Sequence, residues 1–241
     1  MALGTFVQED VRRLVEALNF AEKVDRSLGL IREAYEEYGD RLVVANSLGK
    51  DSCVVWDLAK RVDPRIPGFI VTTRFKPPAT RQFMSEVVGR YPELIIYESN
   101  EPVPDRLYAT QPDRCCDVLK VEPTRRAIEE LGVGCWVTGL RCTEGRTRTD
   151  FQEVEERDKG LIKLNPILIW HEREIWQYLA LYRVPVNPLY TEGYRSLGCA
   201  PCSNITSGGD LPAAPEKGPE GPCGRPARKQ AAAVFQPVAI F

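Results

Sequence analysis

Hydrophobic positions along the chain follow two periods, and their alternation predicts the secondary structure. Short apolar runs of strand length occur at 41–46, 66–72, 94–98, 135–139 and 165–169. Between them, apolar residues recur at helical spacing over 51–61, 79–89, 118–131 and 173–182. Strands that alternate with such helices are typical of βαβ units. We therefore expect an α/β fold, a parallel twisted sheet with helices on both faces.

Both ends of the chain depart from this alternation. Residues 1–40 show helical periodicity only, whereas residues 201–241 contain seven prolines and five glycines. A stretch this rich in proline and glycine is typical of irregular chain. We predict three regions: N-terminal helices at 1–40, an α/β domain at 41–198, and a flexible C-terminal arm at 199–241.

Charge and hydropathy narrow the classes of function. The 32 basic and 34 acidic residues give a net charge of −2, which argues against a nucleic-acid partner. No apolar run approaches the roughly 18 residues of a membrane span. Residues 1–12 carry acids and lack the apolar core of a secretory signal. We expect no membrane partner and a cytoplasmic location, where thiols stay reduced.

The chain contains eight cysteines and one histidine. His171 alone excludes a paired-histidine metal site, so the composition favours sulfur chemistry. Cysteines in a reducing compartment are ligands, nucleophiles or buried apolar residues more often than disulfides. Cys53 and Cys135 fall in a predicted helix and strand, and we expect them in the core.

The loop after the first predicted strand reads Ser-Leu-Gly-Lys-Asp-Ser. A strand-to-helix loop presents backbone N–H groups and a positive helix end to phosphate or sulfate. Gly49 permits close backbone approach, Ser47 and Ser52 supply hydroxyls, Lys50 supplies charge, and Asp51 can cap the helix. The Walker pattern G-x-x-x-x-G-K-S/T is absent. The alternative is a plain capped turn.

This hexapeptide resembles the pyrophosphate-binding loop S-G-G-x-D-S of the adenine nucleotide α-hydrolase-like superfamily, with Leu48 in place of the first glycine. The superfamily includes ATP pyrophosphatases, sulfurtransferases and sulfonucleotide reductases. The resemblance implies that the α/β domain at 41–198 binds a nucleotide.

Four cysteines form two pairs. Cys115 and Cys116 are adjacent, and the Cys-x-x-Cys of Cys199 and Cys202 begins 83 residues after Cys116. Four thiolates suffice for zinc or for an iron–sulfur cluster. Adjacent side chains diverge, by about 100° in a helix, which disfavours one small ion and suits a cubane with a separate iron for each thiolate. A reducible disulfide or a chance pairing is the remaining alternative.

The spacing resembles the [4Fe-4S] signature of adenylylsulfate (APS) reductases within the phosphoadenylylsulfate (PAPS) reductase family. The run from Cys115 to Pro123 resembles the family's CC-x-x-x-K-x-x-P stretch, and Trp136 to Arg141 resembles its strand ending in G-x-R. The resemblance covers about residues 41–203. It implies that the four paired cysteines bind a [4Fe-4S] cluster.

The resemblance also assigns basic residues to the substrate. Lys120 would place positive charge between cluster and substrate, and Arg141 and Arg148 would face the nucleotide's anionic groups. Guanidinium groups suit bidentate recognition of phosphate and sulfate. The alternatives are an exposed helix lysine and a solvated basic turn.

The reaction implied is reduction of APS, or of PAPS, to sulfite and AMP, or PAP, in sulfate assimilation, with a thioredoxin or glutaredoxin-like donor. In the family the attacking cysteine lies near the C-terminus in an E-C-G-x-H motif. Cys223 with Gly224 matches the Cys-Gly step, while the glutamate and histidine are absent. Cys223 is the candidate nucleophile and Cys142 the reserve.

Two other functions fit the sequence. The intact Lys-Asp-Ser of the loop is typical of ATP pyrophosphatases, which suggests an ATP-dependent iron-sulfur sulfurtransferase. A non-catalytic nucleotide-binding relative is the third hypothesis. The cluster cysteines favour APS over PAPS, because they accompany APS-type enzymes more often. A homo-oligomer is compatible with the sequence.

Overall fold

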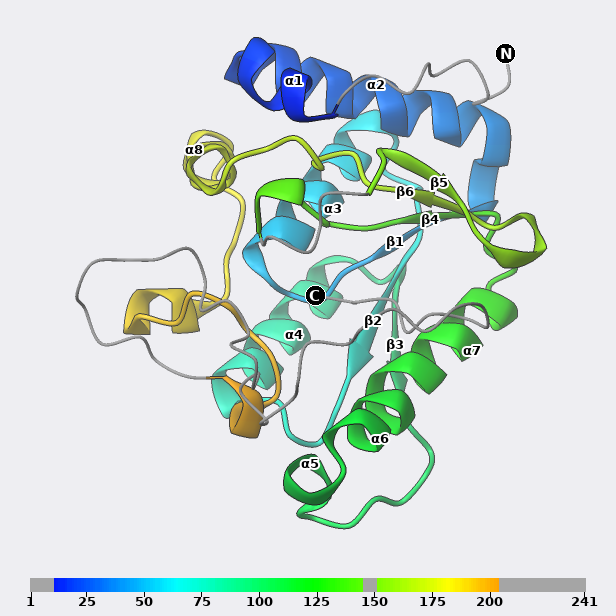
Figure 1. Ribbon diagram of the computed structural model, residues 1–241, viewed down its shortest axis with the longest axis vertical. Helices are drawn as coiled ribbons and strands as arrows, with labels where there is room; N and C mark the ends of the chain where they lie inside the picture. The colour runs from blue at the N-terminus through cyan, green and yellow to red at the C-terminus, as the bar shows by residue number, and fades with distance from the viewer. Residues whose placement is uncertain (1–10, 145–150, 204–241) are drawn as a thin grey trace.

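The computed structural model describes residues 11–144 and 151–203 (Figure 1). At its centre is a six-stranded sheet with the strand order β3-β2-β1-β4-β6-β5. The strands are β1 (Leu42–Ala45), β2 (Gly68–Thr72), β3 (Leu94–Glu98), β4 (Cys135–Val137), β5 (Val154–Glu156) and β6 (Ile162–Leu164). All neighbours pair in parallel except β5, which runs antiparallel to β6 at one edge. The predicted α/β class is confirmed.

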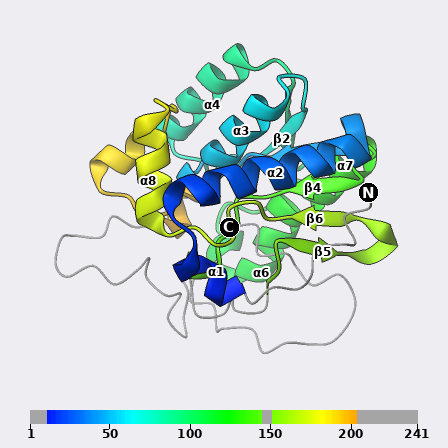
Figure 2. The same ribbon diagram turned by 90° about the horizontal axis from the view of Figure 1, so that it is seen from above.

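Helices cover both faces of this sheet. They are α1 (Val11–Ala17), α2 (Phe20–Tyr38), α3 (Lys50–Val62), α4 (Pro78–Arg90), α5 (Leu107–Thr110), α6 (Pro112–Cys116), α7 (Glu122–Glu130) and α8 (Glu172–Leu181). On one face, Leu42 and Val44 pack with buried residues of α2, α3 and α8. On the other, Val43 packs with Trp136 and with Ala127 of α7. Seen from above, α2 crosses over the sheet near β4 and β6 (Figure 2). Successive residues of a strand point to opposite faces of the sheet, so they pack into two separate hydrophobic cores, one on each face.

The structure defines the N-terminal helices and corrects one predicted strand. The helix α2 begins after Asn19, which caps it by accepting a hydrogen bond from the N–H of Glu22. The strand expected at 165–169 is wrong, because β6 ends before it and β5 pairs with β6 instead. Pro166 lacks the N–H that a strand ladder requires. Asn165 is used in the turn, where its side chain accepts a hydrogen bond from Thr138 Oγ1.

The carboxyl ends of β1, β2 and β4 meet at one edge of the sheet. Ala45 of β1 pairs with Phe69 of β2, and Val44 pairs with Val137 of β4. In open α/β sheets, ligands bind where strands end at this edge. Within the described ranges, no helix is long and apolar enough to cross a bilayer.

Candidate active site

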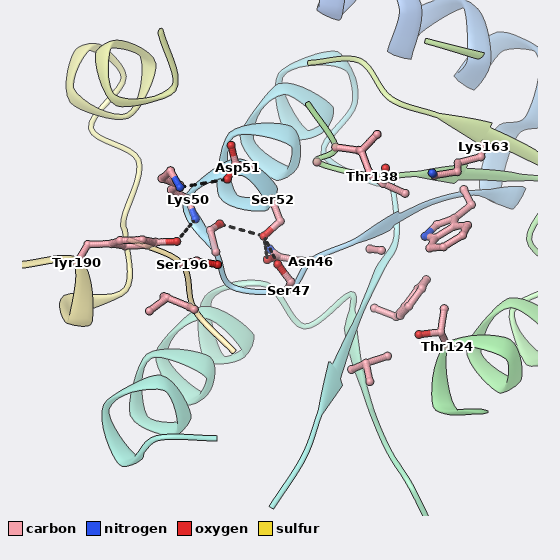
Figure 3. A pocket seen from close by; sticks show the side chains of 18 residues that line it. Asn46, Ser47, Lys50, Asp51, Ser52, Thr124, Thr138, Lys163, Tyr190 and Ser196 are labelled. Carbon is pink, nitrogen blue, oxygen red and sulfur yellow. Dashed lines mark hydrogen bonds and ion pairs between the residues drawn. The ribbon is translucent and has the colours of Figure 1, made fainter. Parts of the chain in front are cut away.

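A cavity lies at this edge of the sheet, between the loop after β1 and the segment that follows α8 (Figure 3). Ser47, Lys50 and Asp51 line one end, together with Tyr190. Apolar side chains of β2 and β4 line it as well: Phe69, Val71 and Trp136. One polar end and one apolar wall suit a ligand with an anionic group and a flat ring.

Side-chain hydrogen bonds hold the loop in place. Asn46 Oδ1 accepts the N–H of Leu48 at 2.8 Å and the hydroxyl of Ser52 at 3.1 Å. The hydroxyls of Ser47 and Ser52 lie 3.1 Å apart. Gly49 is the N-cap of α3, which begins at Lys50. The structure therefore places all five predicted loop residues, Ser47, Gly49, Lys50, Asp51 and Ser52, around one cavity.

Leu48 explains how the loop keeps its shape without the family's first glycine. Its backbone is left-handed, with φ of 66°, a conformation that favours glycine and costs other residues roughly 1–2 kcal/mol. Its side chain is only 1% exposed and belongs to the core cluster. Burial of a leucine is worth about 1.5–3 kcal/mol, which offsets the backbone strain.

Arg141 contacts the loop through Asp51, the second residue of α3. Its side chain is buried, is not part of the cavity lining, and donates from Nε to Asp51 Oδ1 at 2.5 Å. Its Nη1 donates to Thr143 Oγ1. The guanidinium thus contacts a loop residue at the start of α3, and its contact with the nucleotide stays a prediction. Arg148 lies outside the described residues.

Gly139 lies directly behind the loop. A Cβ atom at this position would be 2.9 Å from the backbone nitrogen of Ser52 and 3.0 Å from the carbonyl carbon of Asp51. These are backbone atoms that cannot rotate away, so the loop itself would have to shift. The closeness of the strand end to the loop depends on this glycine.

We expect Gly139→Ala to weaken nucleotide binding about tenfold and to destabilise the fold by about 1–3 kcal/mol, the usual cost of overpacking. Calorimetric titration with AMP and denaturant unfolding measure the two effects. Gly89→Ala is the matched control, because a Cβ there meets nothing within 4 Å. Unchanged AMP affinity in Gly139→Ala would show that the loop tolerates displacement.

The two cysteine pairs come together around a second cavity. Cys115 and Cys116 end α6, and Cys199 and Cys202 flank a short turn near the end of the described chain. All four line the same small cavity, with Lys120 beside them. Cys199 is anchored by Thr73, whose Oγ1 lies 3.2 Å from its Sγ. Residues 83 positions apart in sequence are therefore neighbours in the fold.

Residues 41–205 match the model of the phosphoadenosine phosphosulfate reductase domain. The chain belongs to this family.

Two relatives in sequence and one solved structure show what this chain is similar to. An adenosine 5'-phosphosulfate reductase of Halalkalibacterium halodurans is 35% identical, over 85% of this chain and 90% of its own length. A phosphoadenosine 5'-phosphosulfate reductase of Gloeobacter violaceus is 32% identical, over 71% of this chain and 75% of its own. The crystal structure of a PAPS reductase from Candida auris has a TM-score of 0.64 at 24% identity, covering 81% of this chain and 96% of that one.

In this member of the phosphoadenosine phosphosulfate reductase family, two lysines lie near the cysteines. Lys120 lies in the π-helical segment Asp117–Val121 that directly follows Cys116. Lys76 is 5% exposed, and its pKa is lowered to about 8, mainly by burial and also by the positive charge of Lys120, while Cys199 acts in the opposite direction. Sequence reasoning missed Lys76, because nothing in the local pattern distinguishes it from a surface lysine.

The remaining described cysteines lie in the core or pack against it. Cys53 and Cys135 are buried, as expected, and burial raises the pKa of each thiol to about 12. Cys142 is half-buried and packs against the core. Cys223 lies outside the described residues. Sequence reasoning also missed Tyr190, whose contact with the loop spans 140 residues.

Proposed function

We propose that this chain is a sulfonucleotide reductase that reduces APS to sulfite and releases AMP. One observation carries the proposal: the loop cavity and the cysteine cavity share one edge of the sheet and one segment of chain. Ser196 and Leu197 line the first cavity, and Cys199 and Cys202 line the second. Family membership and the names of the relatives support the same activity.

The chemistry balances with thiols as the reductant. The thiolate of Cys223 attacks the sulfur of APS, the bond from sulfur to the bridging phosphate oxygen breaks, and AMP leaves. A thiolate of a dithiol donor, thioredoxin or a glutaredoxin-like protein, then attacks the Cys223 sulfur and expels sulfite. The donor's second thiol resolves the mixed disulfide, so the donor is oxidised to its disulfide and sulfur(VI) is reduced to sulfur(IV).

We further propose that Cys115, Cys116, Cys199 and Cys202 hold a [4Fe-4S] cluster. Among the described residues, no group of three or more His, Cys, Asp or Glu side chains is arranged to hold a metal ion. A cubane differs from a single ion, because its four thiolate ligands bind four separate irons, and four thiols around one cavity fit that donor set. When bound, the cluster supplies charge and a rigid anchor beside the substrate, while the electrons come from the thiols.

We choose APS over PAPS because the four cysteines accompany APS-type reductases more often than PAPS-type ones. A cytoplasmic location fits the same chemistry, because both the nucleophile and the donor must be reduced thiols.

A sulfite-release assay tests the activity. The protein is purified without oxygen, mixed with reduced thioredoxin, and given APS, PAPS or ATP in separate reactions. We expect sulfite from APS, a slower rate with PAPS, and no product from ATP alone. Absence of sulfite from both sulfonucleotides would contradict the proposal, and pyrophosphate release from ATP would favour the sulfurtransferase alternative.

A further inference from the structure

The hydroxyl of Tyr190 lies at the start of α3, on the anion-binding side of the loop. Its oxygen accepts the backbone N–H of Lys50, the first residue of α3, at 2.9 Å (Figure 3). The N–H groups of a first helical turn lack partners within the helix, and they bind anions well. The neutral phenol oxygen of Tyr190 therefore accepts the Lys50 N–H in the cavity that the proposed function assigns to the nucleotide.

The phenol oxygen and a phosphate oxygen would share one donor. The backbone of Lys50 has a single N–H, and the Tyr190 oxygen accepts it at 2.9 Å. A Cβ atom on the neighbouring Gly49 would lie 3.5 Å from the Tyr190 oxygen and 3.4 Å from Ser47 Oγ, so both side chains lie beside this N–H at van der Waals distance. The two acceptors therefore compete for one hydrogen atom.

A second contact ties the same loop to the same segment. Lys50 Nζ donates to the carbonyl oxygen of Arg195 at 3.1 Å and lies 5.6 Å from the centre of the Tyr190 ring. Tyr190 itself belongs to the short turn Pro188–Glu192. The segment that leads to Cys199 is thus held to the loop by two contacts.

We propose that Tyr190 is a gate on the nucleotide site: its hydroxyl occupies the N–H of Lys50 until a phosphate group of the nucleotide displaces it. Hydrogen bonds to an ionised acceptor are roughly twice as strong as those between neutral groups, so the phosphate wins this competition. The inference rests on the proposed function only for the identity of the anion. Displacement of Tyr190 would loosen the segment that leads to Cys199 and Cys202.

The fluorescence of Trp176 can report on movement of Tyr190. The Trp176 ring contacts the Tyr190 ring edge to face, with centroids 5.3 Å apart, and Trp176 is 37% exposed. Movement of Tyr190 therefore changes the environment of this indole. Trp136 lines the cavity, so its own fluorescence responds to nucleotide directly. The contribution of Trp176 to the fluorescence change must therefore be separated by substitution.

The test is the affinity of the full chain for AMP and for inorganic phosphate, measured by calorimetry. Tyr190→Phe keeps the ring beside Lys50 and Trp176 and removes only the competing hydroxyl. We expect it to bind both anions about threefold to tenfold more tightly, the worth of one net hydrogen bond. Tyr194→Phe, in the same segment, is the matched control and should leave both affinities unchanged.

The sign of the change separates the gate from a merely structural role. Weaker or unchanged binding by Tyr190→Phe would overturn the inference, because a tyrosine that only supports the loop cannot improve affinity when it is removed. Fluorescence gives a second readout: AMP should change the wild-type emission, and part of that change should disappear in Trp176→Phe. If Trp176→Phe retains the whole change, Tyr190 does not move.

The two proposals fail in different ways. A wild-type chain that binds AMP and releases no sulfite would contradict the proposed function. The gate would then be judged on the AMP affinity of Tyr190→Phe relative to that of the wild-type chain. A chain that releases sulfite, with no gain in affinity in Tyr190→Phe, would contradict the gate alone. If neither the wild-type chain nor Tyr190→Phe binds AMP or inorganic phosphate, the gate is overturned.

Discussion

Replacing Cys199 by serine is expected to remove iron from the protein and to abolish sulfite release. Cys199 is 6% exposed and is fixed on both sides, by Thr73 at its sulfur and by the hydrogen bond from the N–H of Ala200 to the carbonyl oxygen of Phe75. A serine at this position stays in place, but its hydroxyl is a hard oxygen ligand where iron–sulfur clusters take soft thiolates. Loss of one of four ligands from a buried site should therefore prevent assembly.

Iron and acid-labile sulfide assays after anaerobic purification measure this effect. We expect about four of each per wild-type chain and a near-complete loss in Cys199→Ser. Cys53→Ala is the matched control, because this cysteine is equally buried, lies in α3 and lines neither cavity. Full iron content in Cys199→Ser would contradict the ligand assignment, and zinc in the wild-type protein would contradict the cluster.

The parts of the fold that local pattern specifies could be predicted. Strand and helix periods identified β1 and α3, and the loop between them was recognised from six consecutive residues. The cysteine pairs were predicted as one group from their spacing and its resemblance to a family signature, and the structure places all four around one cavity. Each of these features is encoded in a short stretch of sequence, or in a pattern that few other arrangements satisfy.

Long-range contacts could not be predicted in this way. The ion pair of Arg141 with Asp51 joins residues 90 positions apart. Tyr190 reaches Lys50 over 140 positions. Neither local periodicity nor residue type indicates which distant backbone an arginine or a tyrosine will meet. The left-handed Leu48 is similar, because its strain is offset only by tertiary burial.

Replacing Cys223 by serine is expected to lower sulfite release to less than about one per cent of the wild-type rate while leaving the iron content unchanged. The attacking group must be a thiolate, and a serine hydroxyl without an activating base does not replace it. In the absence of a donor, APS should leave a sulfonate on Cys223 of the wild-type chain, which mass spectrometry of the digested protein would locate. This outcome differs from that of Cys199→Ser, which loses turnover and iron together.

Cys142 is the matched control for this experiment, because it was the other candidate nucleophile. Its N–H donates to the carbonyl oxygen of Leu168 at 2.8 Å, its side chain packs against the core, and it does not line the nucleotide cavity. Cys142→Ser should therefore retain most of the turnover. If Cys142→Ser is inactive and Cys223→Ser is active, the roles are exchanged. The attack would then come from the chain beside Arg141, and the Cys-Gly step near the C-terminus would have no part in catalysis.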